Sequence, residues 1–334
     1  MRYFLLKVLG FVLIGFIPIS ILTIGYFYND PFKVVRKYNS YSNLYVIPNR
    51  DYVSTEMFLK NEKYYSYNSF IFGSSRTLAF QPNKWKTFLS PNSNPFMFDA
   101  SGESVYGIYT KLKFLDSLHY KLNNVLIIIC RDVSFANSKN HNGHLFIKHP
   151  ATSGESDLSF KFDFFKAYLN PAFLFNFYMY KLSGSYKSYM KGYIEDRKII
   201  MDSITNAVQI VDQEHEIQVS SKKYYEKRKA IFYTRKNETI DSIQQIKQIH
   251  IFMLNEIRRI LNKNNTKYKV IISPLYEQEK FNSVDQNILL NIFKNNLYDF
   301  SGKNYFTDSI NNYYETWHFR PLVGDSIMNL IYKK

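Results

Sequence analysis

The chain has 334 residues, of which 46% are hydrophobic, and this content is typical of a packed globular protein rather than a disordered one. Its net charge is +15, but the basic residues are spread along the chain without a dense arm and no nucleic-acid-binding motif occurs, so we expect a solvated basic surface and no nucleic-acid partner. The single cysteine, Cys130, excludes an intrachain disulfide and a metal site built from several cysteines. Its place in an apolar run predicts a buried side chain.

The N-terminal segment is the first predicted element. Residues 8–28 form an apolar stretch long enough to cross a hydrocarbon core of about 30 Å, with Lys7 before it and aromatic residues at its far end. We therefore predict an uncleaved transmembrane anchor over residues 1–30. The competing interpretation is a cleavable signal peptide, which is less favoured because no small-residue cleavage site follows. The basic residues on the two sides are balanced, so the positive-inside rule does not decide the orientation.

Apolar runs in the rest of the chain predict strands of one parallel sheet. Residues 31–65 are interpreted as a linker segment that leads into the main domain. Short apolar runs bounded by turn residues, and rich in β-branched side chains, are typical of strands buried on both faces. The predicted strands lie within 69–75 (SFIFGSS), 94–102 (NPFMFDASG), 123–130 (NNVLIIIC) and 267–276 (KYKVIISPLY).

Helical patterns separate these runs. They cover 107–118, 240–264 and a short segment after His318. Their apolar stripes run through Ile108, Leu112, Leu115 and Leu118, through Ile243, Ile246, Ile249, Leu254, Ile257 and Leu261, and through Val323, Ile327 and Leu330. Strands that alternate with helices predict an α/β domain over 66–334 with a mostly parallel sheet. An aromatic-rich stretch at about 135–240 breaks the alternation, and we interpret it as an inserted, mainly helical subdomain or lid.

Polar residues follow the predicted strands at their carboxyl ends, where sites form in open parallel sheets. They are Gly73-Ser74-Ser75-Arg76, Asp99-Ala100-Ser101-Gly102, Arg131-Asp132 and Ser273. Among them, Ser74, Arg76 and Asp132 are candidates for substrate binding.

A carboxylate and a histidine near the C-terminus complete a set for nucleophilic catalysis. Glu315 precedes His318 by three residues, which lets the carboxylate orient the imidazole as a proton acceptor. Ser75 at a strand end then supplies the nucleophile for acyl chemistry. The backbone N–H groups of Ser75 and Gly102 are candidates for an oxyanion hole, because glycine lets a substrate approach the backbone closely.

The order of these motifs resembles the SGNH/GDSL hydrolase superfamily. Residues 73–76 align with its first block, which makes Ser75 the nucleophile, Gly102 matches the second-block glycine, and Glu315-Thr316-Trp317-His318 matches the final block. More narrowly, the chain is similar to membrane-anchored SGNH-like proteins of bacterial cell-surface polysaccharide modification. This similarity rests on Gly-Ser-Ser-Arg in the first block and on His-Phe-Arg-Pro-Leu-Val-Gly-Asp, which starts at His318. The resemblance covers roughly 66–134 and 265–334.

The resemblance implies both a fold and a function. The fold would be three-layer α/β/α and flavodoxin-like. The function would be acyl-ester chemistry on a cell-surface polysaccharide or other glycan, either O-acetyl transfer or ester hydrolysis, without a metal or organic cofactor. A membrane-bound O-acyltransferase is an implied partner, and the implied location is the inner membrane with the main domain outside the cytoplasm.

The chain departs from the family pattern at two places, and one of them supports a second hypothesis. The third block should supply an oxyanion-hole asparagine, but the strand here ends in Cys130-Arg131-Asp132, and Asn137 is only nearby in sequence. The final carboxylate is Glu315 rather than aspartate, which still allows it to orient a histidine. The missing asparagine favours the alternative of a non-catalytic SGNH-like module that binds glycan or holds a membrane acyltransferase in place.

Several candidate site residues also have a possible structural role. Ser75 is also a candidate helix N-cap, and His318 a histidine that is simply hydrogen-bonded to Glu315. We favour a structural role for Asp132, as a cap or a backbone acceptor, over a catalytic one. The spacing of His141, His144 and His149 allows three imidazole metal ligands, but their segment has no carboxylate in a recognised zinc pattern, so we predict no metal site.

Overall fold

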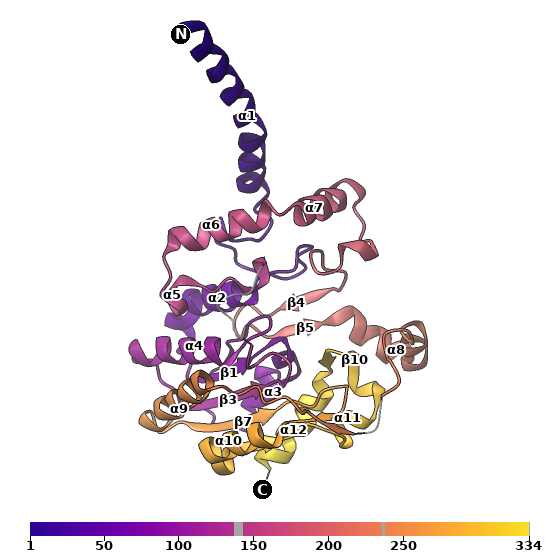
Figure 1. Ribbon diagram of the computed structural model, residues 1–334. Coiled ribbons are helices and arrows are strands. Elements are labelled where there is room, and N and C mark those ends of the chain that lie inside the picture. Colours follow the sequence, from indigo (N-terminus) through magenta and orange to yellow (C-terminus); the bar gives the residue numbers. More distant parts are fainter. Residues whose placement is uncertain (137–142, 236–237, 334) are drawn as a thin grey trace.

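The computed structural model describes residues 1–136, 143–235 and 238–333, without the side chains of 2, 5, 6, 8, 9 and 11–15 (Figure 1). Within these residues a five-stranded sheet has the order β2-β1-β3-β7-β9, and all of its strand pairs are parallel. The strands are β1 (Ser69–Gly73), β2 (Pro95–Met97), β3 (Asn124–Ile129), β7 (Lys267–Ile272) and β9 (Leu297–Asp299). The predicted α/β class with a parallel sheet is thus confirmed, and the strand order is that of flavodoxin-like sheets.

Helices cover both faces of the sheet, which gives three layers. Because side chains alternate along a strand, Phe70 and Phe72 pack on one face and Ile71 on the other. The first face is covered by α2 (Arg50–Tyr65), α4 (Val105–Ser117), α9 (Gln248–Lys263) and α10 (Ser283–Phe293). The second face is covered by α3 (Pro82–Lys86) and α12 (Pro321–Tyr332).

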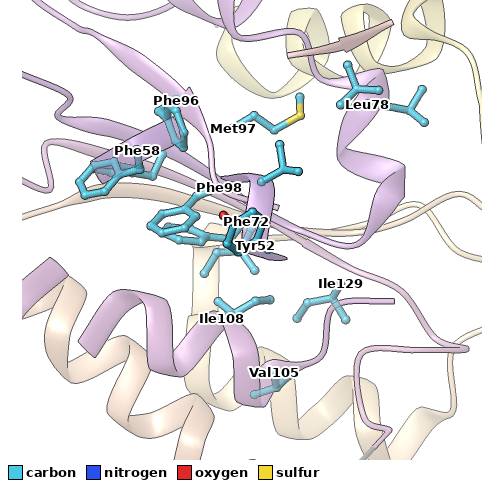
Figure 2. Close-up of a cluster of buried hydrophobic side chains, with 14 of the residues drawn as sticks. Tyr52, Phe58, Phe72, Leu78, Phe96, Met97, Phe98, Val105, Ile108 and Ile129 are labelled. Atoms are coloured by element: carbon cyan, nitrogen blue, oxygen red, sulfur yellow. The ribbon is translucent and has the colours of Figure 1, made fainter. Parts of the chain in front are cut away.

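Aromatic rings form much of the core on the first face. Figure 2 shows Phe98 between Phe58 of α2 and Phe72. The Phe58 and Phe98 rings are stacked with centroids 5.4 Å apart, and the Phe98 and Phe72 rings are 5.9 Å apart. Offset stacking of this kind adds to the energy of burial, so the many phenylalanines of the sequence have a packing role here.

The inserted stretch is mostly helical and also contains a strand pair. It includes α5 (Pro150–Ser153), α6 (Asp157–Tyr168), α7 (Pro171–Ser183), β4 (Ile199–Met201), β5 (Val208–Ile210) and α8 (Val211–Lys227). Strands β4 and β5 pair antiparallel. Shorter elements elsewhere are β6 (Thr239–Ile240), β8 (Glu279–Lys280), α11 (Tyr305–Asp308), β10 (Tyr313–Glu315), β11 (His318–Phe319) and 3₁₀ helices at 75–79, 144–146, 188–190, 294–296 and 310–312.

Several predicted elements differ from the structure. The segment read as a linker contains α2, which was missed because its buried face carries Asp51, Ser54 and other polar residues. The helix predicted over 240–264 begins only at Gln248. Residue 240 belongs instead to β6, which pairs with β8. Two positions of the predicted apolar stripe, Ile243 and Ile249, are exposed. Strand β9 was not predicted. The predicted stripe positions Leu118 and Leu330 are also exposed.

The N-terminal helix α1 (Arg2–Asn29) covers the segment predicted as an anchor. Within the described part of the chain, no helix combines the length and the apolar character needed to cross a bilayer. Several side chains of the predicted anchor lie outside the described residues, and the anchor stays a prediction.

Candidate active site

A cleft opens at the carboxyl edge of the sheet, where the strand order reverses. Strand β1 lies between β2 and β3, so the segments that follow these three strands meet at one edge. They contribute Ser75, Gly102 and Asp132, and the C-terminal region contributes His318. The cleft has a volume of about 320 Å³, at the lower end of the range of small-molecule sites.

The turn after β1 explains the Gly-Ser-Ser sequence. Gly73 has a φ of +151°, and an added Cβ would lie 2.8 Å from the Ile128 carbonyl oxygen, so only glycine fits. Ser74 is buried, and its hydroxyl accepts from the Arg76 N–H at the start of the 3₁₀ helix Ser75–Ala79. The N-cap is therefore Ser74, and the interpretation of Ser75 as the cap is wrong. The Ser75 hydroxyl is left to face the cleft.

Ser75, His318 and Glu315 form a chain of hydrogen bonds. The Ser75 Oγ lies 2.8 Å from His318 Nε2. On the other side of the ring, His318 Nδ1 is hydrogen-bonded to Glu315 Oε1. Because a carboxylate accepts, Nδ1 carries the proton, and Nε2 is left to accept from the serine hydroxyl. The structure thus brings together the residues expected as nucleophile, base and orienting carboxylate.

A tight hairpin sets the distance between Glu315 and His318. Strands β10 and β11 pair antiparallel with Glu315 opposite His318, so two residues form the turn. The Trp317 N–H donates to Glu315 Oε2 at 2.7 Å, which fixes the second carboxylate oxygen. The meeting of the two side chains was predicted, but the β-hairpin that produces it was not.

The environment keeps Glu315 ionised. Burial raises the pKa of its carboxyl, but the hydrogen bond and charge of His318, the Trp317 N–H and the charge of Arg197 together hold the pKa below its usual value. An ionised carboxylate stabilises the imidazolium that forms when His318 takes a proton.

Replacing Glu315 by glutamine is expected to lower the rate of any Ser75-dependent acylation by about 10²-fold or more, because an amide does not hold the productive tautomer. Reaction rates with a serine-reactive probe would measure this effect. A Glu315→Asp variant is the matched control, since it keeps the charge, and we expect it to retain more activity than glutamine. Equal rates for wild type and Glu315→Gln would contradict the orienting role.

Residues of the inserted stretch hold the hairpin, which sequence reasoning missed. Tyr224 and Tyr225 of α8 donate their hydroxyl protons to the carbonyl oxygens of Tyr314 and Tyr313, both at 2.8 Å. The Tyr314 hydroxyl in turn donates to Glu214 at 2.7 Å. These contacts join residues about 90 positions apart, and a tyrosine pair on a helix carries no local signal of such a role. The insertion therefore supports the site.

Arg76 and Asp132 are engaged with each other. The guanidinium binds the carboxylate with two parallel bonds of 2.7 Å, and Arg76 Nε donates to the Trp317 carbonyl oxygen at 2.9 Å. Arg76 thereby ties the end of β3 to the turn before His318, in the fork geometry that arginine favours. Both residues and Ser74 line the cleft. Their role in substrate binding stays a prediction. The described contacts of the Asp132 carboxylate are these bonds from Arg76, rather than the capping or backbone contacts favoured from the sequence.

The proposed oxyanion donors also border the cleft. Ser75 and Gly102 line it, and within the described part of the chain neither N–H donates to a backbone acceptor. Gly102 has a φ of +54°, and an added Cβ would lie 3.0 Å from the Phe146 ring. The described lining residues include no asparagine, and Asn137 lies outside the described residues. The apolar residues Val133, Ala136 and Phe146 complete the lining.

The histidines considered as metal ligands have other partners where the structure describes them. His144 Nε2 donates to the Ile47 carbonyl oxygen at 2.9 Å, and His149 Nε2 lies 3.1 Å from Glu56. His141 lies outside the described residues. Among the described residues, no group of three or more histidine, cysteine or acidic side chains has the geometry of a metal site.

Acidification is expected to destabilise the protein through His144. Burial lowers the pKa of His144 to about 4, although its bond to Ile47 opposes this effect. Between that value and the ordinary pKa of about 6.5 the unfolded chain binds more protons, so stability falls as the pH drops from 6.5 toward 4, by at most about 3 kcal/mol. Urea unfolding at several pH values would measure the loss, and a His144→Gln variant should lose less. An equal pH dependence in both proteins would exclude His144 as the cause.

No family model matches the sequence, and no curated protein matches it significantly.

Proposed function

We propose that this protein carries out acyl-ester chemistry, as O-acetyl transfer or ester hydrolysis, on a cell-surface glycan. The observation that carries the proposal is the 2.8 Å contact between Ser75 Oγ and His318 Nε2, with Glu315 bonded to the other ring nitrogen. A distance within hydrogen-bond reach is what a serine nucleophile and its base require. The family assignment to SGNH-like proteins is part of the proposal and rests on the sequence motifs.

The contacts support the following reaction. Ser75 Oγ attacks the acyl carbonyl carbon while His318 Nε2 takes the hydroxyl proton, and Glu315 stabilises the resulting imidazolium. The N–H groups of Ser75 and Gly102 bind the oxyanion of the tetrahedral intermediate. His318 then gives its proton to the departing alcohol, which leaves an acyl ester on Ser75. Water or a sugar hydroxyl then attacks this ester as His318 takes its proton, and His318 returns that proton to the departing Ser75 Oγ, which regenerates the serine.

The cleft surface fits an acylated sugar. Val133, Ala136 and Phe146 offer an apolar wall for the acyl group. Trp317, which is 61% exposed, lies at the cleft with a flat face suited to a sugar ring. Whether water or a sugar hydroxyl accepts the acyl group separates hydrolase from transferase. The extracytoplasmic location, the membrane anchor and a membrane-bound O-acyltransferase partner belong to the same proposal and derive from the resemblance.

A second candidate function is a non-catalytic module that binds glycan or positions a membrane acyltransferase. One observation favours it. The family pattern has an oxyanion-hole asparagine just after the third strand, whereas here β3 is followed by Arg131 and by Asp132, which is paired with Arg76. A module of this kind would bind acylated sugar without turnover.

Labelling with a fluorophosphonate probe separates the two candidates. We expect the purified full-length protein to be labelled on Ser75, as shown by peptide mapping, and the label to be lost in His318→Ala. Ser101, a serine of the cleft lining next to Gly102, provides the matched control, since Ser101→Ala should label normally. A folded protein that binds acylated sugar but takes no label at Ser75 would support the binding module instead.

A further inference from the structure

The C-terminal end of α1 is seated between α6 and α7. Tyr26 is buried, and its ring centroid lies 5.3 Å from those of Phe165 and Tyr168 on α6. A Cβ on Gly25 would lie 2.8 Å from the Tyr178 hydroxyl of α7. Lys181 of α7 also donates to the Asn29 side chain. The direction in which α1 leaves the domain is therefore fixed relative to these two helices, as Figure 1 shows.

Helix α6 carries two apolar stripes on opposite sides. Its inner stripe, Phe160, Phe164 and Tyr168, is buried in the core. At 3.6 residues per turn, Leu158, Phe162 and Phe165 share the opposite side, and Leu158 and Phe162 are exposed. Phe165 of this stripe and Tyr168 of the inner stripe both contact Tyr26 of α1. Figure 1 shows α1 leaving α6 on the side away from the central sheet, which is the side opposite the buried inner stripe.

Helix α7 repeats the arrangement. Phe173 and Phe177 are buried, whereas Phe175 and Leu182 are exposed on the opposite side, where the half-buried Tyr178 also lies. The Tyr178 hydroxyl faces Gly25 of α1, so this stripe also lies on the α1 side. We call Leu158, Phe162, Phe175 and Leu182 the outer stripe, and these residues are between 58% and 83% exposed.

Apolar exposure continues along α1 itself. Beyond the face formed by α6 and α7, the exposed side chains of α1 include Phe16, Ile17, Ile19, Ile21 and Ile24. Lysines 161 and 166 flank the outer stripe of α6 on its two sides. An apolar stripe bordered by lysines, on helices that lie across the base of an apolar helix, is the pattern of a membrane-interface surface.

We propose that α6 and α7 rest on a phospholipid bilayer, with the outer stripe among the acyl chains and the exposed apolar residues of α1 in the same lipid. The large exposed apolar area then has a partner, as such patches usually do. We call this contact of α6 and α7 with lipid the membrane footprint. In Figure 1 the β4–β5 pair lies between α6–α7 and β10, the strand that ends at Glu315, so the membrane footprint would hold the catalytic cleft away from the lipid surface. The inference is independent of the proposed chemistry, because it uses none of the site residues.

Depth-dependent fluorescence quenching tests the membrane footprint on the full chain in phosphatidylcholine–phosphatidylglycerol vesicles. Phe162→Cys, Leu182→Cys and Ile21→Cys variants would each carry an environment-sensitive nitrobenzoxadiazole label, while native Cys130 is buried and stays unlabelled. Leu330→Cys on α12 is the matched control, since Leu330 is 62% exposed and helix α12 lies at the end of the molecule opposite α1. We expect doxyl-labelled lipid to remove about half of the signal at residues 162, 182 and 21 and very little at 330.

Each outcome decides the proposal. Quenching at residue 21 with none at 162 and 182 would show that α1 enters lipid while α6 and α7 stand clear of it, which overturns the membrane footprint. Absence of quenching at all four positions would overturn both parts. Near-ultraviolet circular dichroism of each variant confirms that the fold is kept. Neither result bears on probe labelling at Ser75, so a failure here is distinct from a failure of the proposed function.

Discussion

Replacing Ser75 by alanine is expected to abolish ester turnover, with a loss of about 10³-fold or more, and to leave the fold intact. The hydroxyl is the group that faces His318 Nε2 at 2.8 Å, and no other described side chain is hydrogen-bonded to that nitrogen. Its removal takes away the nucleophile at a partly exposed position, so the stability cost is about 1 kcal/mol or less. Hydrolysis of p-nitrophenyl acetate and of acetylated sugars would measure the turnover.

Ser74 supplies a matched comparison one residue earlier. Its hydroxyl is buried and caps the 3₁₀ helix, so Ser74→Ala is expected to cost about 1 kcal/mol of stability while retaining measurable turnover. The two variants should therefore have opposite effects: Ser75→Ala loses activity but little stability, and Ser74→Ala loses stability but keeps measurable activity. Full turnover by a folded Ser75→Ala protein would contradict a mechanism in which Ser75 is the nucleophile.

Replacing Lys111 by methionine is expected to destabilise the protein by about 3–5 kcal/mol. Lys111 is fully buried and lies 2.7 Å from Glu103 and 3.2 Å from Asp51. Lys148 contacts the same two carboxylates at 2.6 and 3.2 Å, so two positive and two negative charges balance. Loss of one lysine leaves an uncompensated charge in the core, which is what makes the substitution costly.

A paired substitution tests this explanation. Lys111→Met with Glu103→Gln restores the charge balance and is expected to recover part of the lost stability, as a double-mutant cycle would show. Urea unfolding of the wild type, the two single variants and the double variant completes the cycle. Lys111 also donates to the Asp99 carbonyl oxygen at 2.9 Å, at the start of the loop that bears Gly102, so the single variant should also react more slowly with a serine probe. A single variant within about 1 kcal/mol of wild type would contradict the network's importance.

The same network fixes how stability depends on acid. Burial alone would raise the pKa of Asp51, but the charges of Lys111 and Lys148 hold that pKa below its ordinary value. A carboxyl whose folded pKa is depressed stabilises the protein above its unfolded pKa of about 4 and loses that contribution only as the pH falls toward the folded pKa. The loss expected from His144 therefore begins at higher pH than the loss from Asp51.

The strand cores, the α/β class and the residues of the candidate site were predictable from the sequence. A run such as residues 125–129 indicates a buried strand by itself, because burial on both faces demands apolar side chains at every position. Ser75 and Gly102 follow such strands, and the carboxyl ends of parallel strands share one edge, so their approach follows from topology. Glu315 and His318 are three residues apart, so their contact could be predicted from the local sequence alone.

Only the tertiary structure decided how these groups are held. Helix α2 buries Asp51 because Lys111 and Lys148, which lie 60 and 97 positions away along the chain, compensate its charge, and no local pattern shows such a partner. The hydroxyls of Tyr224 and Tyr225 support the hairpin of Glu315 from a distant helix for the same reason. Apolar burial leaves a periodic signature in the sequence, whereas a buried polar side chain is stable only beside a partner that the fold brings to it.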